Sequence, residues 1–366
     1  MSATFIPCAA ELFAWLETHA ASLDSETDLA AELLPRLAAA GLPGVGVAEA
    51  LGGDGGDVTD GVEAIAAVSE RSLAAGFVLW GHRTYIEYLL QSPNAALRDR
   101  QLPDLLAGRA AGATGLSNAM KFLSGLAELQ VCARTQGDRL ALDGKLPWVT
   151  NLRPQGFHVA TVVARENGAT PLVISLAHDD PGLVRSADLD LLSLRASNTA
   201  AVSLSGVQVG TERVIHDDAG AWLPMVRPAF LGLQCGMSIG LARRALAEAR
   251  RGVGTGREAL TEPLAKLDAM LAEQERMLRD GLRSGAFESE PATLFRIRIA
   301  LADIIGHAVG LELQATGGRA FLRSPGAEFG RRWHEAAFIP IVTPSVLQLK
   351  AALAAEATPS RRTMTH

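Results

Sequence analysis

An indole, a hydroxyl and a carboxamide stand within four residues of one another at Trp148, Thr150 and Asn151. A flat indole can cover one face of a tricyclic ring, and a Thr hydroxyl can bond to a nitrogen or carbonyl at the edge of that ring. The segment follows a predicted hairpin over residues 140–144 and leads into an alternating strand over residues 157–165. By itself this pattern favours a core Trp beside a turn, and a strand-edge site that grips the isoalloxazine of a flavin is the alternative that the rest of the chain has to support.

Bulk composition narrows the class of protein. The chain has 366 residues, which is long for a single core, so we expect two or three packed subdomains. Hydrophobic residues make up 48% of the sequence and aromatic residues only 5%, a balance that favours close-packed helices over a sandwich or barrel. The net charge of −6 gives nucleic acid no basic face to bind, so that class of partner is excluded.

Cysteine usage and the apolar runs indicate the cellular setting. Cys8, Cys132 and Cys235 are far apart and form no CxxC pair, which favours a reducing cytoplasm. The start of the chain lacks a basic region followed by an apolar core, and no apolar run approaches about 20 residues. We therefore expect a soluble, cytoplasmic protein with no membrane partner. The histidines have no ligand spacing, so no metal site is predicted.

Hydrophobic periodicity divides the chain into three zones, which we predict to be domains over residues 1–108, 109–215 and 216–366. The first zone has helical spacing at residues 9–21, 28–40, 58–75, 85–90 and 102–106. The second has strand patterns at residues 131–134, 139–142, 157–164, 172–176 and 200–209. The third returns to helical spacing at residues 230–251, 260–282 and 291–315. Together these zones predict an α+β fold, mainly α, with an N-terminal helical domain, a central antiparallel β domain and a C-terminal four-helix bundle.

Five motifs follow one another along these zones. They are a helix end followed by a Gly-Gly pair at residues 34–56, Leu-Pro-Asp-Leu-Leu-Ala-Gly at 102–108, Thr-Gly-Leu-Ser-Asn-Ala at 114–119, Trp-Val-Thr at 148–150, and Gln-Ala-Thr-Gly-Gly at 314–318. Each is similar to a motif of the acyl-CoA dehydrogenase superfamily, with Ser117 in place of a family Thr. The chain resembles this family over roughly residues 30 to 350, in the family's own order. The resemblance implies that family's fold and an FAD-dependent oxidoreductase.

The resemblance also implies a role for each matching residue. Around the isoalloxazine it places Ser117, Ser124, Trp148, Thr150 and Asn151. Around the ADP half it places Arg257 and, from a neighbouring subunit, Gln314, Gly317 and Gly318. Glycines suit that position because residues without Cβ let backbone amides approach a pyrophosphate closely. FAD is the expected cofactor, with FMN as the alternative, and the expected assembly is a homodimer or homotetramer.

The catalytic carboxylate of the family is missing. Thr343 stands where the resemblance places the Glu that removes the substrate's α-proton, and a Thr hydroxyl cannot accept that proton near pH 7. Some relatives carry the base on the first long C-terminal helix, yet residues 219–247 contain no Asp or Glu. Glu335 is the nearest carboxylate in sequence and is kept as a candidate base. His82 is a candidate of another kind, because a His in this region assists flavin monooxygenases built on the same scaffold.

Three functions therefore stay open. The leading hypothesis is a dehydrogenase that oxidises an acyl-CoA-like substrate and passes electrons to an electron-transfer flavoprotein. The second is a monooxygenase that uses flavin, supplied with electrons by a flavin reductase, and O₂, and needs no carboxylate base. The third is a non-catalytic relative that binds a flavin or an acyl thioester. The sequence does not identify the substrate.

Overall fold

The N-terminal region is helical, as predicted. The computed structural model describes residues 5–123, 128–253 and 258–357. Ser124 and Arg257, both expected at the flavin, lie outside these ranges. The region consists of α1 (Phe5–Ser25), α2 (Ala30–Ala39), the short 3-10 helices η1 (Leu42–Gly44) and η2 (Glu49–Leu51), α3 (Val58–Ser69), α4 (Leu73–Leu90) and α5 (Ala95–Leu106).

The boundary between α3 and α4 differs from the prediction. A single helix was expected over residues 58–75 and a separate one over 85–90, but α3 ends at Ser69 and α4 runs without a break from Leu73 to Leu90. Ser72 causes the division, because its hydroxyl accepts from the backbone N–H of Ala75 at 3.3 Å and so caps the new helix. As a result α4 is one long, almost fully buried helix that packs against α7 and β1.

The central region is one mixed sheet. Its strands are β1 (Ala111–Thr114), β2 (Val131–Gln136), β3 (Arg139–Val149), β4 (Phe157–Arg165), β5 (Leu172–Ala177), β6 (Leu183–Asp188), β7 (Ala200–Val209) and β8 (Val214–His216), and the short helix α6 (Ser117–Leu123) follows β1. The strand order is β6-β7-β3-β2-β4-β5-β8, with β1 beside β4. The predicted antiparallel domain is found with one difference, because β1 and β2 both run parallel to β4 while the other strand pairs are antiparallel. Most of β4 is buried, as expected for a strand between covered neighbours.

Strand β3 carries the indole to the end of the sheet. The predicted hairpin over residues 140–144 lies inside β3, and the turn itself falls between β2 and β3 at Gly137, whose φ is +63°. Gly144 marks a register shift within β3, and a Cβ there would lie 2.2 Å from the carbonyl oxygen of Gln130. The strand therefore continues past this irregularity to Val149, with Trp148 as its second-to-last residue.

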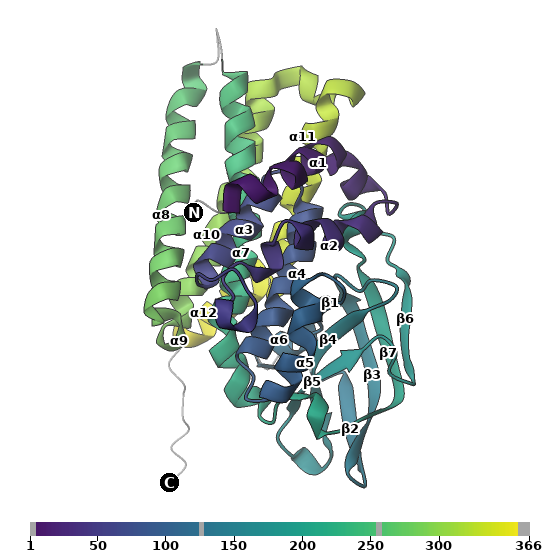
Figure 1. Cartoon of the computed structure of the whole chain (residues 1–366). Helices are drawn as coiled ribbons and strands as arrows, with labels where there is room; N and C mark the ends of the chain where they lie inside the picture. The colour runs from purple at the N-terminus through teal and green to yellow at the C-terminus, as the bar shows by residue number, and fades with distance from the viewer. Residues whose placement is uncertain (1–4, 124–127, 254–257, 358–366) are drawn as a thin grey trace, which may run out of the picture.

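The C-terminal region is a helical bundle, as predicted. It contains α7 (Ala219–Gly252), α8 (Thr261–Ser284), the short α9 (Ala286–Ser289), α10 (Pro291–Thr316), η7 (Gly317–Phe321), α11 (Arg323–Phe338), η8 (Ile339–Ile341) and α12 (Val346–Ala357). Helices α7, α8 and α10 lie side by side, and the sheet lies at the other end of the molecule (Figure 1). Helix α7 is the common element, because it packs against α10, α3, α8 and α4.

Ion pairs between helices fix the arrangement of this bundle. Arg243 of α7 binds Glu63 of α3 at 2.7 Å and Glu275 of α8 at 2.9 Å, which ties three helices together.

Residues Gly326–Glu356 are long and apolar enough to cross a membrane by length and composition. In the structure, however, this stretch is divided among α11, η8 and α12.

Candidate functional site

A cavity of about 420 Å³ lies where the N-terminal helices, the sheet and the C-terminal bundle meet. Its volume is in the range of small-molecule sites. It is lined by Phe77 and Trp80 of α4, Thr114, Ser117 and Asn118 around the β1–α6 junction, Gln130, Pro147, Trp148 and Thr150 around β3, Leu191, Thr199, Phe230 of α7, and Phe338, Ile341, Val342 and Thr343 after α11. Three regions that are far apart in the sequence thus build one site.

The sheet side of the cavity is polar but uncharged. The Thr150 hydroxyl lies 3.1 Å from the hydroxyl of Thr199, and the Thr114 hydroxyl lies 2.8 Å from that of Tyr88. Each hydroxyl has one donor and two acceptor positions, so these contacts leave capacity for a ligand. Asn118 is occupied differently, since its side chain holds the backbone of Glu128 and Gln130. The sheet therefore offers hydroxyls, rather than charges, to whatever binds.

The helix side of the cavity is aromatic. Phe77 and Trp80 stack with their ring centroids 5.6 Å apart, Phe338 meets Phe77 edge-on at 4.9 Å, and Phe230 lies 5.5 Å from Trp80. The indole N–H of Trp80 donates to the Phe230 carbonyl at 3.4 Å, so its polar atom is already used. These four rings pack on one another and form a continuous apolar wall.

Trp148 and Thr150 differ sharply in exposure. Trp148 is 61% exposed although it belongs to a strand, whereas Thr150 is 6% exposed. The interpretation of a core Trp beside a turn is therefore wrong, because the indole lies at the surface of the cavity instead of in the core. An exposed indole can cover the face of a flat ring while the buried hydroxyls beside it bond the ring's edge, which is the arrangement a flavin needs.

None of the described residues that line the cavity is ionisable. The lining consists of aromatic and aliphatic side chains, hydroxyls, amides and one proline, and it contains no Asp, Glu, His, Lys, Arg, Cys or Tyr. A base must come within about 2.6–3.2 Å of the proton it removes. Among the residues that the structure describes, no side chain of the lining can therefore act as a general acid or base near pH 7.

Comparisons with known proteins agree with this geometry. Residues 11–109 match the family model described as "Acyl-CoA dehydrogenase, N-terminal domain". The chain is 25% identical over 338 residues to the probable acyl-CoA dehydrogenase YngJ of Bacillus subtilis, covering 85% of this chain and 86% of that protein. Butyryl-CoA dehydrogenase from Megasphaera elsdenii has the same fold, with a TM-score of 0.80, 18% identity, and 98% of both chains covered. A glutaryl-coenzyme A dehydrogenase in complex with glutaryl-CoA gives a TM-score of 0.82 at 17% identity, covering 98% of this chain and 95% of that one.

The chain is thus similar to the acyl-CoA dehydrogenases over most of its length, in sequence and in fold. The predicted family is thereby confirmed, and with it the order of helical, β and helical regions. The individual residues implied by the resemblance are judged by where the structure puts them. Ser117, Trp148, Thr150 and Thr343 come together around the one cavity described above, although they lie up to 226 positions apart in the sequence.

Glu335 lies outside the cavity lining, and its candidacy as a base is corrected. Its side chain is fully buried on α11, where it accepts from the backbone N–H of Leu73 at 3.1 Å and from Arg331 at 2.7 Å. Leu73 is the first residue of α4, so the carboxyl satisfies an unpaired amide at a helix N-terminus. Burial raises the pKa of Glu335 and the Arg331 charge opposes that rise. This carboxyl joins α11 to α4.

His82 is also corrected, from a catalytic to a structural residue. Its ring is fully buried on α4, with Nε2 2.9 Å from the Leu105 carbonyl oxygen and Nδ1 2.9 Å from the backbone N–H of Gly112. Because the Gly112 amide donates, Nδ1 must accept, which fixes the proton on Nε2. Burial lowers the pKa of His82 to about 4. Both ring nitrogens hold backbone groups, and neither is available to a ligand.

The remaining predicted residues lie away from the cavity lining. The Asn151 side chain donates to the Gly112 carbonyl at 2.9 Å and is buried, so it shapes the backbone around the site without lining it. Gln314 and Gly318 are exposed at the end of α10, and Gly317 ends that helix with a φ of +64°. Nothing in the described chain joins these three residues to the cavity of their own subunit, which suits the neighbouring-subunit role that the resemblance implies.

The aromatic wall was not predicted. Phe77 and Trp80 stand three positions apart on α4, a spacing that puts both on one helix face. That signal was available, but aromatic residues at helical spacing more often belong to a core. Phe230 and Phe338 carried no local signal, because only the packing of α7 and α11 against α4 brings them to the cavity.

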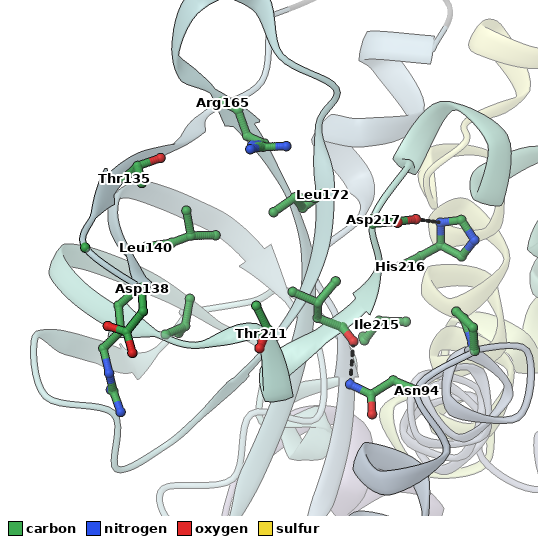
Figure 2. Close-up of a pocket in the computed structure, with 15 residues that line it drawn as sticks. Asn94, Thr135, Asp138, Leu140, Arg165, Leu172, Thr211, Ile215, His216 and Asp217 are labelled. Carbon is green, nitrogen blue, oxygen red and sulfur yellow. Dashed lines mark hydrogen bonds and ion pairs between the residues drawn. The ribbon is translucent and has the colours of Figure 1, made fainter.

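A second depression lies at the far end of the sheet (Figure 2). It has a volume of about 540 Å³ and lies between the β2–β3 turn, β5 and β8. Its rim carries charges of both signs, including Asp138, Arg165 and Asp217, over an aliphatic floor with Leu172 and Ile215. It contains none of the residues implied by the family resemblance and no Phe, Trp or Tyr. Although it is the larger space, we take the aromatic cavity as the functional site.

Proposed function

We propose that the protein is an FAD-dependent oxidoreductase that acts on an acyl-CoA-like substrate. The observation that carries this proposal is the cavity in which an exposed indole, buried hydroxyls and an aromatic wall face one space. A flavin bound there would supply two-electron redox chemistry, which none of the side chains of the described lining provides. The donor set fits this group, because the hydroxyls offer both donors and acceptors to the polar edge of the ring.

Each side of the cavity has its own task in this proposal. Trp148 would cover one face of the isoalloxazine, and Thr150 and Ser117 would bond its edge. The wall of Phe77, Trp80, Phe230 and Phe338 receives the apolar part of the substrate and excludes water from the reacting atoms. Gln314, Gly317 and Gly318 of a second copy would hold the ADP half, which makes FAD the expected cofactor, with FMN the alternative, and a homodimer or homotetramer the working unit.

The uncharged lining supports a second candidate function. Abstraction of a proton next to a carbonyl requires a positioned base, and the described lining supplies none. A monooxygenase that uses reduced flavin and O₂ needs no such base. His82 was expected to assist such a monooxygenase, but it is not available, because both of its ring nitrogens bond backbone groups. In the first case electrons would leave to an electron-transfer flavoprotein, and in the second they would arrive from a flavin reductase. Either protein would work in the cytoplasm.

Flavin binding tests the proposal directly. Purified protein is incubated with FAD or FMN and passed through gel filtration, and the bound flavin is measured by its visible absorbance. Trp148→Ala should weaken FAD binding by about threefold to tenfold, the usual worth of an aromatic stacking contact. Trp333→Ala is the matched control, because Trp333 is 46% exposed on α11 and does not line the cavity. No retained flavin in the wild-type protein would overturn the proposal.

Substrate oxidation separates the candidate functions. FAD-loaded protein is titrated under anaerobic conditions with a panel of acyl-CoAs, and bleaching of the flavin is followed. Bleaching by any member supports the dehydrogenase. If none bleaches it, chemically reduced protein is mixed with O₂ in the presence of the same panel. Hydroxylated product then supports the monooxygenase, and its absence leaves a protein that binds flavin without these reactions.

A further inference from the structure

Arg298 is a fully buried cation that binds carbonyl groups instead of a carboxylate. It lies on α10 with 0% of its surface exposed. Its Nε donates to Oε1 of Gln234 at 2.8 Å, and its Nη2 donates to the carbonyl of Ile339 at 2.6 Å. By contrast, the buried Arg331 and Arg332 each bind a glutamate, Glu335 and Glu312. Burying a charge without a counter-charge is costly, so a residue that does this requires an explanation.

Gln234 continues the chain of contacts to the cavity. It lies on α7, is also 0% exposed, and its Nε2 donates to the backbone carbonyl of Thr343 at 3.0 Å. The amide thus accepts from Arg298 on one side and donates to Thr343 on the other. Helices α7 and α10 pack against each other along the bundle (Figure 1), so both side chains start from a rigid platform.

The two carbonyls that receive these bonds flank one wall of the cavity. Ile339 and Thr343 lie at the two ends of a five-residue segment after α11, and Phe338, Ile341, Val342 and Thr343 all line the cavity. Carbonyls at the end of a helix have no partner within the helix. A cation at this end is also favoured by the helix dipole, which accounts for a guanidinium there without a carboxylate. The bonds reach the backbone, so they fix the wall whatever its side chains are.

We propose that Arg298 and Gln234 are positioning residues that hold the 338–343 wall against α7 and α10 and so set the shape of the ligand site. We call the hydrogen bonds of Arg298 and Gln234 to the 338–343 wall the clamp. The expected effect on flavin binding rests on the proposed function, but the clamp itself does not. Neither residue lines the cavity. They act through Ile339 and Thr343, and the aromatic ring of Phe338 and the side chain of Thr343 take their places as a result.

The test compares two buried glutamines. Gln234→Leu removes the link to Thr343, and Gln101→Leu is the matched control. Gln101 is 4% exposed on α5, does not line the cavity, and bonds the hydroxyls of Tyr85 at 2.8 Å and Ser175 at 3.2 Å. Both changes replace a buried, hydrogen-bonded amide with an apolar side chain, so both should lower Tm. Only Gln234→Leu should speed hydrogen exchange of the backbone amides at 339–343 in the flavin-free protein, and only it should weaken FAD binding, by about tenfold.

Gln234→Glu separates the two halves of the clamp. The carboxylate keeps an acceptor for Arg298 but has no donor for the Thr343 carbonyl. It should therefore resemble Gln234→Leu in exchange at 339–343 and in FAD affinity. Wild-type exchange and affinity in Gln234→Glu, or the same exchange pattern in Gln234→Leu and Gln101→Leu, would overturn the inference. A wild-type protein that binds no FAD sinks the proposed function alone, because the exchange measurement still decides whether the clamp exists.

Discussion

Replacing Thr343 with glutamate would put a carboxylate on the cavity wall at the position where the family resemblance expects a base. Thr343 is half-buried and lines the cavity beside Phe338 and Val342. Its bond to Gln234 uses the backbone carbonyl, so Thr343→Glu leaves that contact in place. We expect this single change to create or strongly increase proton abstraction from an acyl-CoA.

The size of the effect follows from the lining. Because no ionisable side chain of the described lining competes with it, the new carboxyl would be desolvated by Phe338, Ile341 and Val342, and its pKa would rise toward the operating pH. A positioned general base contributes about 10²- to 10⁴-fold to rate. With part of the carboxyl protonated at pH 7, we expect flavin bleaching by an acyl-CoA to accelerate at least about 100-fold, and to rise with pH as the carboxyl ionises.

The assay is anaerobic stopped-flow mixing of FAD-loaded protein with a panel of acyl-CoAs, followed at the flavin absorbance. Thr343→Gln is the control, because it has nearly the same shape and no basic oxygen. Equal bleaching rates in Thr343→Glu and Thr343→Gln, with FAD bound to both, would refute the reasoning. So would a wild-type rate already as fast as that of Thr343→Glu, since a base would then act from a position outside the described lining.

Three further predictions concern residues around the site. Burial lowers the pKa of His82 to about 4, against 6.5 in the unfolded chain, so the stability that His82 contributes is complete above pH 6.5 and is lost as pH falls through 4, a change of roughly 3 kcal/mol. Urea unfolding of wild type and His82→Gln between pH 7.5 and 4.5 should therefore show a flatter pH dependence of stability in the variant. Parallel curves would contradict this prediction. Glu335→Ala should cost about 1–3 kcal/mol of unfolding free energy, because the buried Leu73 amide loses its acceptor and Arg331 keeps only Glu328 as its acidic partner. The flavin spectrum should be unchanged, and a shifted spectrum at full occupancy would return Glu335 to the site. Phe338→Ala should lower Tm and favour bulkier acyl groups in the same bleaching assay, whereas an unchanged order of preference would place the acyl group elsewhere.

Much of the fold could be predicted because its elements carry strong local periodicity. Helices such as α7 and α10 repeat apolar residues over many turns, and strands such as β4 and β7 are bounded by turn residues. The break at Ser72 was missed because the apolar spacing continues across it, while a single hydroxyl cap divides the helix. The parallel pairing of β1 and β2 with β4 has no local signature, since partner choice depends on how the chain returns to the sheet.

Only the sheet side of the site could be predicted from the sequence. Trp148, Thr150 and Ser117 stand in short motifs that keep their order along the chain, so the resemblance could locate them. The aromatic wall depends on contacts between α4, α7 and α11 that no single segment records. His82 and Glu335 were misassigned for a related reason. An imidazole or a carboxyl near a site is chemically suited to catalysis, and only its partners reveal that it holds backbone amides and carbonyls instead.

The most direct test of the central claim is a crystal structure of the protein grown with FAD. We predict electron density for the isoalloxazine inside the aromatic cavity, with one face against Trp148 and its edge within hydrogen-bond distance of Thr150. Density for the ring in the depression at the far end of the sheet, or an empty cavity at saturating FAD, would contradict the assignment of this cavity to a flavin.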